Sequence, residues 1–207
     1  MPTLLHIDAS PRGNFSISRQ LSSAAVELWK RKNPQGRIIE RDLTKTDLTF
    51  VDLDWILGSF SAPDEQTESH KRALAISDQL ISELLEAHEI IIGTPMYNFA
   101  IPAVLKAWID HVVRAGKTFR YTPPSRPEGL AKGRKVIVTV ASGAIYDEAS
   151  GTAAYDYEVP YLRHILGFIG ITDVTVVHAG GTTRVAHGQV SNNEFLAPFL
   201  RQIETAV

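Results

Sequence analysis

The 207-residue chain contains no cysteine. This absence excludes disulfide bonds, Cys-ligated zinc and iron–sulfur sites, and thiol nucleophiles such as that of Cys-based tyrosine phosphatases. The chain also lacks an excess of either charge, because 21 Lys and Arg face 23 Asp and Glu, for a formal net charge of −2. A nearly neutral chain has no global attraction to nucleic acid or to an anionic membrane, so we expect neither as a partner.

Signals for export or membrane insertion are missing as well. No apolar run approaches the length of a membrane span, and the N-terminus enters a strand pattern without the basic and apolar regions of a signal peptide. We therefore expect a cytoplasmic protein. The length and ordinary composition predict a single domain over residues 1–207, large enough for a substantial core.

Several nucleotide-binding and catalytic motifs are absent. The chain has no G-x-x-x-x-G-K-[ST], no G-x-G-x-x-G after its first strand and no G-x-S-x-G, which argues against a P-loop NTPase, a Rossmann NAD site and an α/β-hydrolase. The 7 histidines show no paired spacing such as H-E-x-x-H. We therefore expect no metal site.

What the chain does contain is a fivefold alternation of strand and helix patterns. Strands are predicted at Thr3–Asp8, Arg37–Asp42, Glu89–Gly93, Lys135–Val140 and Asp173–His178. Helices are predicted from about Ser16 to Asn33, and over Glu68–Ala87, Pro102–Ala115, Val159–Phe168 and Ser191–Thr205. The stretches Thr44–Gln66 and Gly116–Gly133 look less regular. This alternation predicts an α/β, doubly wound parallel sheet of order 2-1-3-4-5 with helices on both faces.

The most informative segment is Gly93-Thr-Pro-Met-Tyr-Asn-Phe99, directly after the apolar run Ile90–Ile92. Ligands bind at the carboxyl ends of strands in such sheets. This loop offers backbone amides, one amide side chain and flat apolar groups, which suit a planar heteroaromatic cofactor. An ordinary strand–helix turn with packed aromatics is an equally good interpretation of the spacing alone.

Three loops should meet at the carboxyl edge of the sheet: Ala9–Ser18, Thr94–Phe99 and Ala141–Tyr146. The first carries Ser10, Ser16 and Ser18 around a helix start, where free amides and the helix dipole favour a phosphate. The alternative is that Ser16 or Ser18 only caps the helix. Taken with the other two loops, the phosphate is the better interpretation.

Four segments resemble the FMN-dependent NADH-azoreductases: Asp8-Ala-Ser-Pro-Arg-Gly-Asn-Phe-Ser-Ile-Ser18, Pro95-Met-Tyr-Asn-Phe99, Ala115-Gly-Lys-Thr-Phe-Arg-Tyr121 and Leu166-Gly-Phe-Ile-Gly-Ile171. That family consists of flavodoxin-like homodimers related to NAD(P)H:quinone reductases. The resemblance covers nearly the whole chain. It implies a flavodoxin-like fold, bound FMN, NADH as electron donor, small quinone or azo substrates, and a homodimer.

By position, the resemblance also implies the site residues. The FMN phosphate would be held by Ser10, Ser16, Ile17 and Ser18, and the isoalloxazine would be lined by Met96, Tyr97, Asn98 and Phe99. A third contact would come from Ala141, Ser142, Gly143 and Ala144, where the family usually has a Ser-Arg-Gly-Gly-like turn. Because only the first Gly of that turn is kept, we expect this segment to contact the flavin through its backbone amides. Five aromatic residues are expected either to form the walls of the substrate site or simply to pack in the core: Phe60, Phe119, Tyr121, Tyr146 and Phe168.

The expected function is two-electron transfer from NADH to quinones, with reductive cleavage of azo compounds, by a ping-pong mechanism on FMN. No side chain needs to act as an acid or base, so no catalytic residue is assigned. The main alternative is a flavodoxin-type electron carrier, and a second is a flavin-free binding module. Carriers of that type are usually strongly acidic, whereas this chain is nearly neutral.

Overall fold

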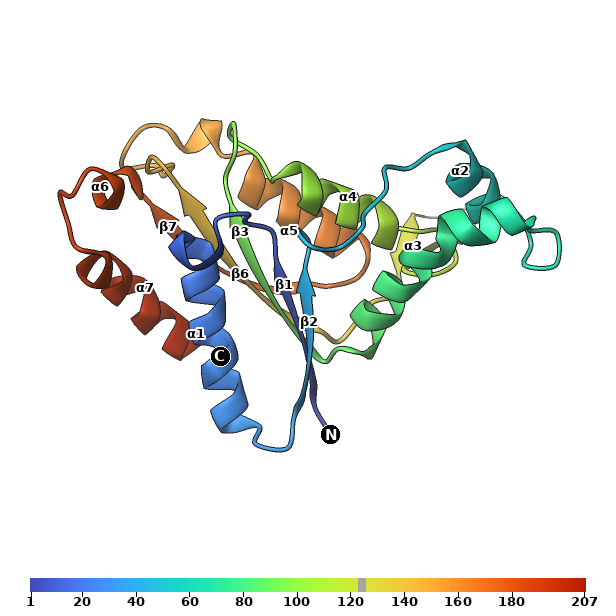
Figure 1. The fold of residues 1–207 in the computed structure, drawn as a ribbon, viewed down its shortest axis with the longest axis horizontal. Coiled ribbons are helices and arrows are strands. Elements are labelled where there is room, and N and C mark those ends of the chain that lie inside the picture. The colour runs from blue at the N-terminus through green and yellow to red at the C-terminus, as the bar shows by residue number, and fades with distance from the viewer. Residues whose placement is uncertain (123–125) are drawn as a thin grey trace.

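The computed structural model describes residues 1–122 and 126–207. Its main sheet contains five parallel strands in the order β2-β1-β3-β6-β7 (Figure 1). These are β1 (Thr3–Asp8), β2 (Arg37–Asp42), β3 (Glu89–Pro95), β6 (Lys135–Ser142) and β7 (Asp173–Gly180). Counting only these five strands, the order is 2-1-3-4-5, so the predicted topology is confirmed.

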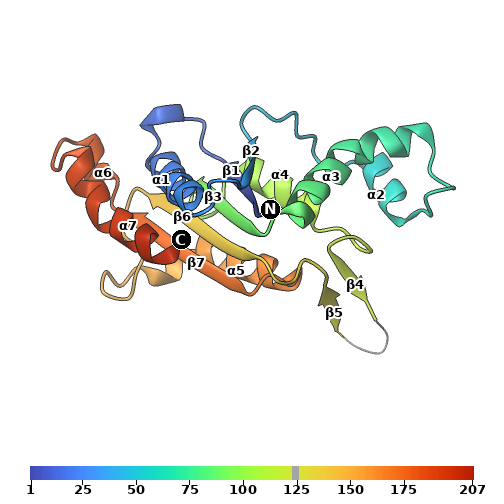
Figure 2. The same cartoon turned by 90° about the horizontal axis from the view of Figure 1, so that it is seen from below.

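Helices cover both faces of the sheet. Helices α1 (Ile17–Lys32) and α7 (Asn192–Ala206) pack side by side on one face (Figures 1 and 2). The other face carries α3 (Glu68–Glu86), α4 (Ala103–Val112) and α5 (Glu158–Phe168). Since successive strand residues point to opposite faces, Ile91 belongs to the first core and Ile90 and Ile92 to the second. A strand buried on both faces therefore has a continuous apolar sequence.

Three strands run two residues further than predicted, to Pro95 in β3, Ser142 in β6 and Gly180 in β7. Their pairing continues in register, with Pro95 beside Ala141 and Ser142 beside Gly180. Proline and small residues are typical of loops, so the ends predicted from the sequence come two residues too early. As a result, Ala141 and Ser142 belong to a strand, whereas the sequence had placed them in a loop.

Two irregular stretches contain elements that the sequence did not predict. Helix α2 (Leu53–Phe60) lies within Thr44–Gln66 and is capped by Asp52, whose side chain accepts a hydrogen bond from Trp55 N at 2.8 Å. The stretch Gly116–Gly133 contains an antiparallel hairpin of β4 (Phe119–Tyr121) and β5 (Pro127–Gly129). Residues 123–125 of that stretch lie outside the described part. Short helices η1 (Gly13–Phe15), η2 (Ala153–Tyr155) and α6 (Thr183–Ala186) complete the structure.

The topology places three connections at one edge of the sheet. They follow β1, β3 and β6, which are neighbours in the sheet, so their carboxyl ends lie next to one another. The β4–β5 hairpin and α2 lie at the other end of the molecule from α6 (Figure 2). Within 1–122 and 126–207, no helix has both the length and the apolarity needed to cross a membrane.

Candidate functional site

The first component of the site is the connection from β1 to α1. Helix α1 begins after Ser16, whose Oγ accepts a hydrogen bond from Arg19 N at 3.4 Å, so the capping interpretation holds for this residue. The first helical hydrogen bond runs from Gln20 N to Ser16 O at 3.0 Å, and the amides of Ile17 and Ser18 precede it. The hydroxyls of Ser16 and Ser18 are 3.1 Å apart, so one hydrogen joins them and the other can reach a ligand. Together with the helix dipole, these donors are suited to an anion.

Arg19 holds this connection in place. Its Nε donates to Ser10 O at 2.7 Å, while its terminal nitrogens donate to Asp8 Oδ2 at 3.2 Å and to Asp42 Oδ1 at 2.7 Å. Burial favours the neutral form of Asp42, but hydrogen bonds from Arg19 and Thr44 lower the pKa of this carboxyl to about 2. The loop is therefore tied to the ends of both β1 and β2 before any ligand arrives. No motif in the sequence indicated this role for Arg19.

The second component is a tight turn after β3. Tyr97 and Ala100 exchange backbone hydrogen bonds of 2.9 and 3.1 Å, and the two residues between them have positive φ, 49° at Asn98 and 70° at Phe99. This is the geometry of a type I′ turn. Such backbone costs on the order of 1–3 kcal/mol per non-glycine residue and is concentrated at ligand sites. Phe99 is held by a hydrogen bond from Tyr157 N to its carbonyl at 3.0 Å.

The third component is the turn after β6. Ser142 Oγ donates to Ala144 O at 2.7 Å, so His178 Nε2, 2.8 Å from the same oxygen, must donate to it. On the other side of that ring, Nδ1 is 3.8 Å from Asp156 Oδ2. Burial lowers the pKa of His178, although nearby carboxylates oppose this effect. A neutral histidine with its proton on Nε2 therefore braces the turn. The sequence did not single out this role of His178.

These three connections, together with Thr182 from the connection after β7, line one pocket. Its lining consists of Ser10, Arg12, Ser16, Ile17, Pro95, Met96, Tyr97, Ala141, Gly143 and Thr182. Seven of the twelve residues predicted to bind the cofactor are therefore in the lining. Of the remaining five, Ser18 and Ser142 are buried behind it, and Asn98, Phe99 and Ala144 are exposed on the adjacent turns. The sequence had assigned no role to Arg12 or Thr182.

The aromatic residues predicted for the substrate walls do not gather at this pocket within one copy of the chain. Phe119 is buried and packs against Phe168, with ring centroids 4.7 Å apart, and against Tyr121 at 5.5 Å. This cluster joins the β4–β5 hairpin to the end of α5, away from α6 (Figure 2). Phe60 is 80% exposed on α2. Only Tyr146 lies near the site, with its ring centroid 6.0 Å from that of Phe99.

A buried carboxyl supports the turn after β3 from behind. Glu158, in the first turn of α5, is fully buried, and its Oε1 is 2.9 Å from Thr94 Oγ1. Its Oε2 has no hydrogen-bond partner among the described residues. Burial, with a smaller contribution from the negative charge of Asp156, raises the pKa of Glu158 to about 9. Glu158 is therefore a neutral acid near pH 7. From the sequence alone it looked like an ordinary acidic residue at a helix start.

Comparison with known proteins gives strong matches along the whole chain. A family model described as the flavodoxin-like fold matches residues 2–203. A Burkholderia lata protein named FMN-dependent NADH:quinone oxidoreductase 8 is 46% identical over 206 residues, covering 100% of this chain and 96% of its own. A protein of Jannaschia sp. named FMN-dependent NADH:quinone oxidoreductase 2 is 44% identical, covering 100% and 99%.

Solved structures show the same relationship. An azoreductase from Bacillus anthracis superposes with a TM-score of 0.88 at 31% identity, covering 99% of this chain and 98% of its own. A second B. anthracis protein, described as an FMN-dependent NADH-azoreductase in complex with FMN, has a TM-score of 0.87 at 26% identity, covering 100% and 97%.

The buried acid leads to a prediction about stability. The carboxyl of Glu158 ionises near pH 4.5 in the unfolded chain and near 9 in the folded one, so the free energy of unfolding falls as the pH rises between these values. Glu158→Gln removes this dependence and should raise the free energy of unfolding at pH 7 by about 3 kcal/mol. Below pH 4 the gain should vanish.

Urea unfolding at pH 4, 7 and 8.5 measures the effect. The control is Glu204→Gln, which changes an exposed residue of α7. A gain for Glu158→Gln that does not vary with pH would contradict the assignment of a neutral buried acid.

Proposed function

Because the chain belongs to the flavodoxin-like family of FMN-dependent NADH:quinone oxidoreductases, we propose that it binds FMN at the three-loop pocket and uses it to reduce quinones and aromatic azo compounds. The observation that carries the proposal is the single pocket that joins an anion site at the start of α1 to the turns after β3 and β6. NADH is the electron donor.

The residues of the pocket fit FMN. The amides of Ile17 and Ser18 and the hydroxyl of Ser16 suit a phosphate dianion. Among the described residues, no carboxylate lines the pocket, so no negative charge opposes the phosphate. Met96 and Tyr97 offer apolar surface for a flat ring. The residues assigned to the phosphate and those assigned to the ring therefore line the same pocket.

When bound, FMN supplies the hydride chemistry, from NADH to the flavin and onward to a quinone or azo compound. The chain orients the cofactor and tunes its charge. The backbone amides near Asn98 and Gly143 would stabilise negative charge on the bound ring. The bond from His178 to Ser142 keeps the Gly143 turn in one geometry. We assign no side chain as acid or base, and protons come from solvent.

An electron carrier of the flavodoxin type is the alternative function. Such carriers usually dock through strong negative charge, whereas this chain has a formal net charge of −2. The decisive experiment has two parts: the visible absorption spectrum of the purified protein, and NADH consumption with a quinone. Flavin absorbance together with rapid NADH consumption supports the enzyme. Flavin absorbance without NADH consumption supports the carrier.

The phosphate assignment predicts the effect of Ser16→Ala on FMN affinity. A hydrogen bond to a charged phosphate contributes about 1.5–3 kcal/mol, so the dissociation constant should rise about ten- to a hundred-fold. Ser18→Ala should act in the same direction but less strongly, because Ser18 reaches the pocket through Ser16. Titration of the apoprotein with FMN measures both changes.

Thr67→Ala is the matched control, because it removes the N-cap of α3, which lies outside the pocket. Losing a cap costs about 1 kcal/mol of stability, and in this control it should leave FMN affinity unchanged. Unchanged affinity in both serine variants would rule out the phosphate site.

We also predict that the protein forms a homodimer whose interface is part of the active site. Phe50, Leu53 and Phe60 are 79%, 68% and 80% exposed, and exposed apolar groups gathered in one segment are typical of contact surfaces. The family resemblance points the same way. A second copy could also bring aromatic residues that lie far from the pocket within one chain.

Light scattering should therefore give twice the chain mass of 22.8 kDa. Phe60→Asp should shift the protein toward monomer and lower its activity, because a charge would be buried in the interface. A fully active monomer would refute this prediction.

A further prediction concerns the order in which the two substrates bind and react. If one face of the flavin serves both substrates, oxidised nicotinamide must leave before a quinone can approach, which gives double-displacement kinetics. Plots of reciprocal rate against reciprocal NADH concentration, at several fixed quinone concentrations, should be parallel. NADH alone should bleach the flavin absorbance fully. Intersecting lines, with bleaching only when both substrates are present, would indicate a ternary complex and exclude the shared face.

A further inference from the structure

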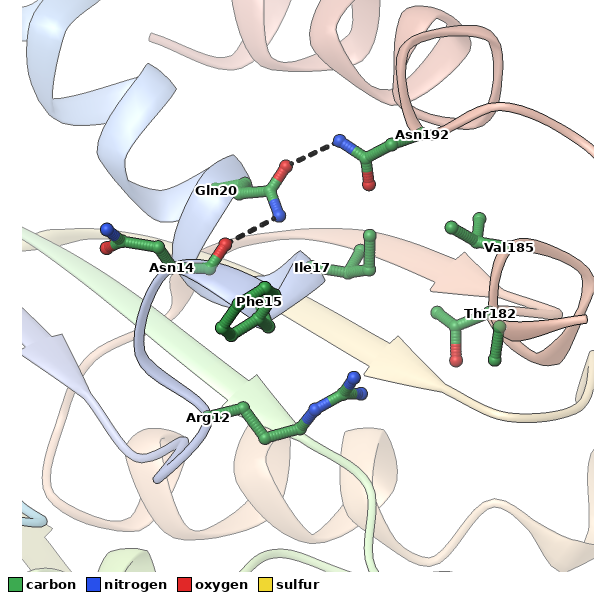
Figure 3. Close-up of a pocket in the computed structure, with 9 residues that line it drawn as sticks. Arg12, Asn14, Phe15, Ile17, Gln20, Thr182, Val185 and Asn192 are labelled. Carbon is green, nitrogen blue, oxygen red and sulfur yellow. Dashed lines mark hydrogen bonds between the residues drawn. The ribbon is translucent and has the colours of Figure 1, made fainter. Parts of the chain in front are cut away.

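A second cavity adjoins the flavin pocket, between the start of α1, α6 and the start of α7. It has a volume of about 460 Å³, within the range of small-molecule sites. Its lining consists of Arg12, Asn14, Phe15, Ile17, Gln20, Thr182, Val185, Ala186 and Asn192 (Figure 3). Three of these residues, Arg12, Ile17 and Thr182, also line the flavin pocket, so the two spaces are contiguous.

Arg12 stands at the boundary between the two spaces. Among the described residues, it is the only charged residue that lines either of them. Its guanidinium forms no ion pair with a carboxylate of residues 1–122 or 126–207. Figure 3 shows this side chain extending below Phe15 toward Thr182. A free guanidinium in this position is suited to a phosphate or pyrophosphate group.

The other end of the cavity has features that suit a flat heterocyclic base. The ring of Phe15 is 81% exposed and lies beside the cavity. Above it, Asn192 Nδ2 donates to Gln20 Oε1 at 2.8 Å, and Gln20 Nε2 donates to Asn14 O at 3.0 Å. This chain fixes the Asn192 amide and leaves its oxygen free on the cavity side (Figure 3). An aromatic face and an amide edge are the groups that stack on a purine and hydrogen-bond to it.

We propose that this cavity binds the adenosine diphosphate part of NADH. The inference rests on the proposed function, since the same donor must place its nicotinamide in the adjoining flavin pocket. Arg12 binds the pyrophosphate, the Phe15 ring stacks on the adenine, and the Asn192 amide accepts a hydrogen bond from the base. The amides at the start of α1 remain for the phosphate of FMN.

The test compares NADH with N-benzyl-1,4-dihydronicotinamide, a hydride donor without phosphate or adenosine. With FMN-loaded protein, Phe15→Ala should raise the apparent dissociation constant of NADH about ten-fold, from lost base stacking. It should leave reduction by the benzyl donor and the affinity for FMN unchanged. Arg12→Gln should likewise raise the apparent dissociation constant of NADH. Calorimetry with ADP-ribose gives a readout without turnover, and Phe15→Ala should weaken this binding by a similar factor.

Arg184→Gln is the matched control, because it removes an exposed cation of α6 outside the lining of both pockets. It should leave reduction by both donors and the affinity for ADP-ribose unchanged. Equal effects of Phe15→Ala on both donors, or no effect on either, would overturn the proposal. If Arg12→Gln weakens FMN and slows both donors alike, the guanidinium serves the flavin phosphate and the pyrophosphate assignment is wrong. If neither donor reduces the flavin of the wild-type protein, the proposed function is wrong. The assignment of NADH as the ligand of this cavity then fails with it.

Discussion

The parallel register of β1, β3 and β6 is the constraint on which the rest of the site depends. Asp8 pairs with Gly93, and Pro95 with Ala141, so these strands end within a few residues of one another. Each connection that follows must then leave the sheet at the same edge. A shift of two residues in one pairing would move that connection by about 6–7 Å along the strand and would open the pocket. The apolar cores on both faces fix this register, because each helix packs on side chains from several strands.

Polar side chains then hold the three connections in their functional shapes. Arg19 fixes the loop before α1, a neutral Glu158 stands behind the turn after β3, and His178 braces the turn after β6. Each of these groups is partly or fully buried and bonded to another side chain or to a backbone carbonyl. The positive φ at Asn98 and Phe99 is retained in this setting. A pocket held in this way needs little rearrangement to receive a rigid, flat cofactor.

The sequence was sufficient for the sheet order and for the three loops, because both follow from local patterns of apolar and turn-forming residues. It was insufficient where tertiary contacts decide. Pro95 and Ser142 resemble loop residues, yet both extend strands, because a paired neighbour continues beside them. Helix α2 was missed because its 8 residues are too few to show a clear helical period. The roles of Arg12 and Thr182 could not be found from spacing, since only the fold brings the β1 and β7 connections together.

We propose that FMN binds in the one pocket formed by the connections after β1, β3 and β6. A crystal structure of the protein with bound FMN would locate the cofactor. We expect the phosphate at the amides of Ile17 and Ser18, and the ring against Met96 and Tyr97, with its pyrimidine edge toward Gly143. A flavin bound elsewhere, or a phosphate that does not contact the start of α1, would contradict it.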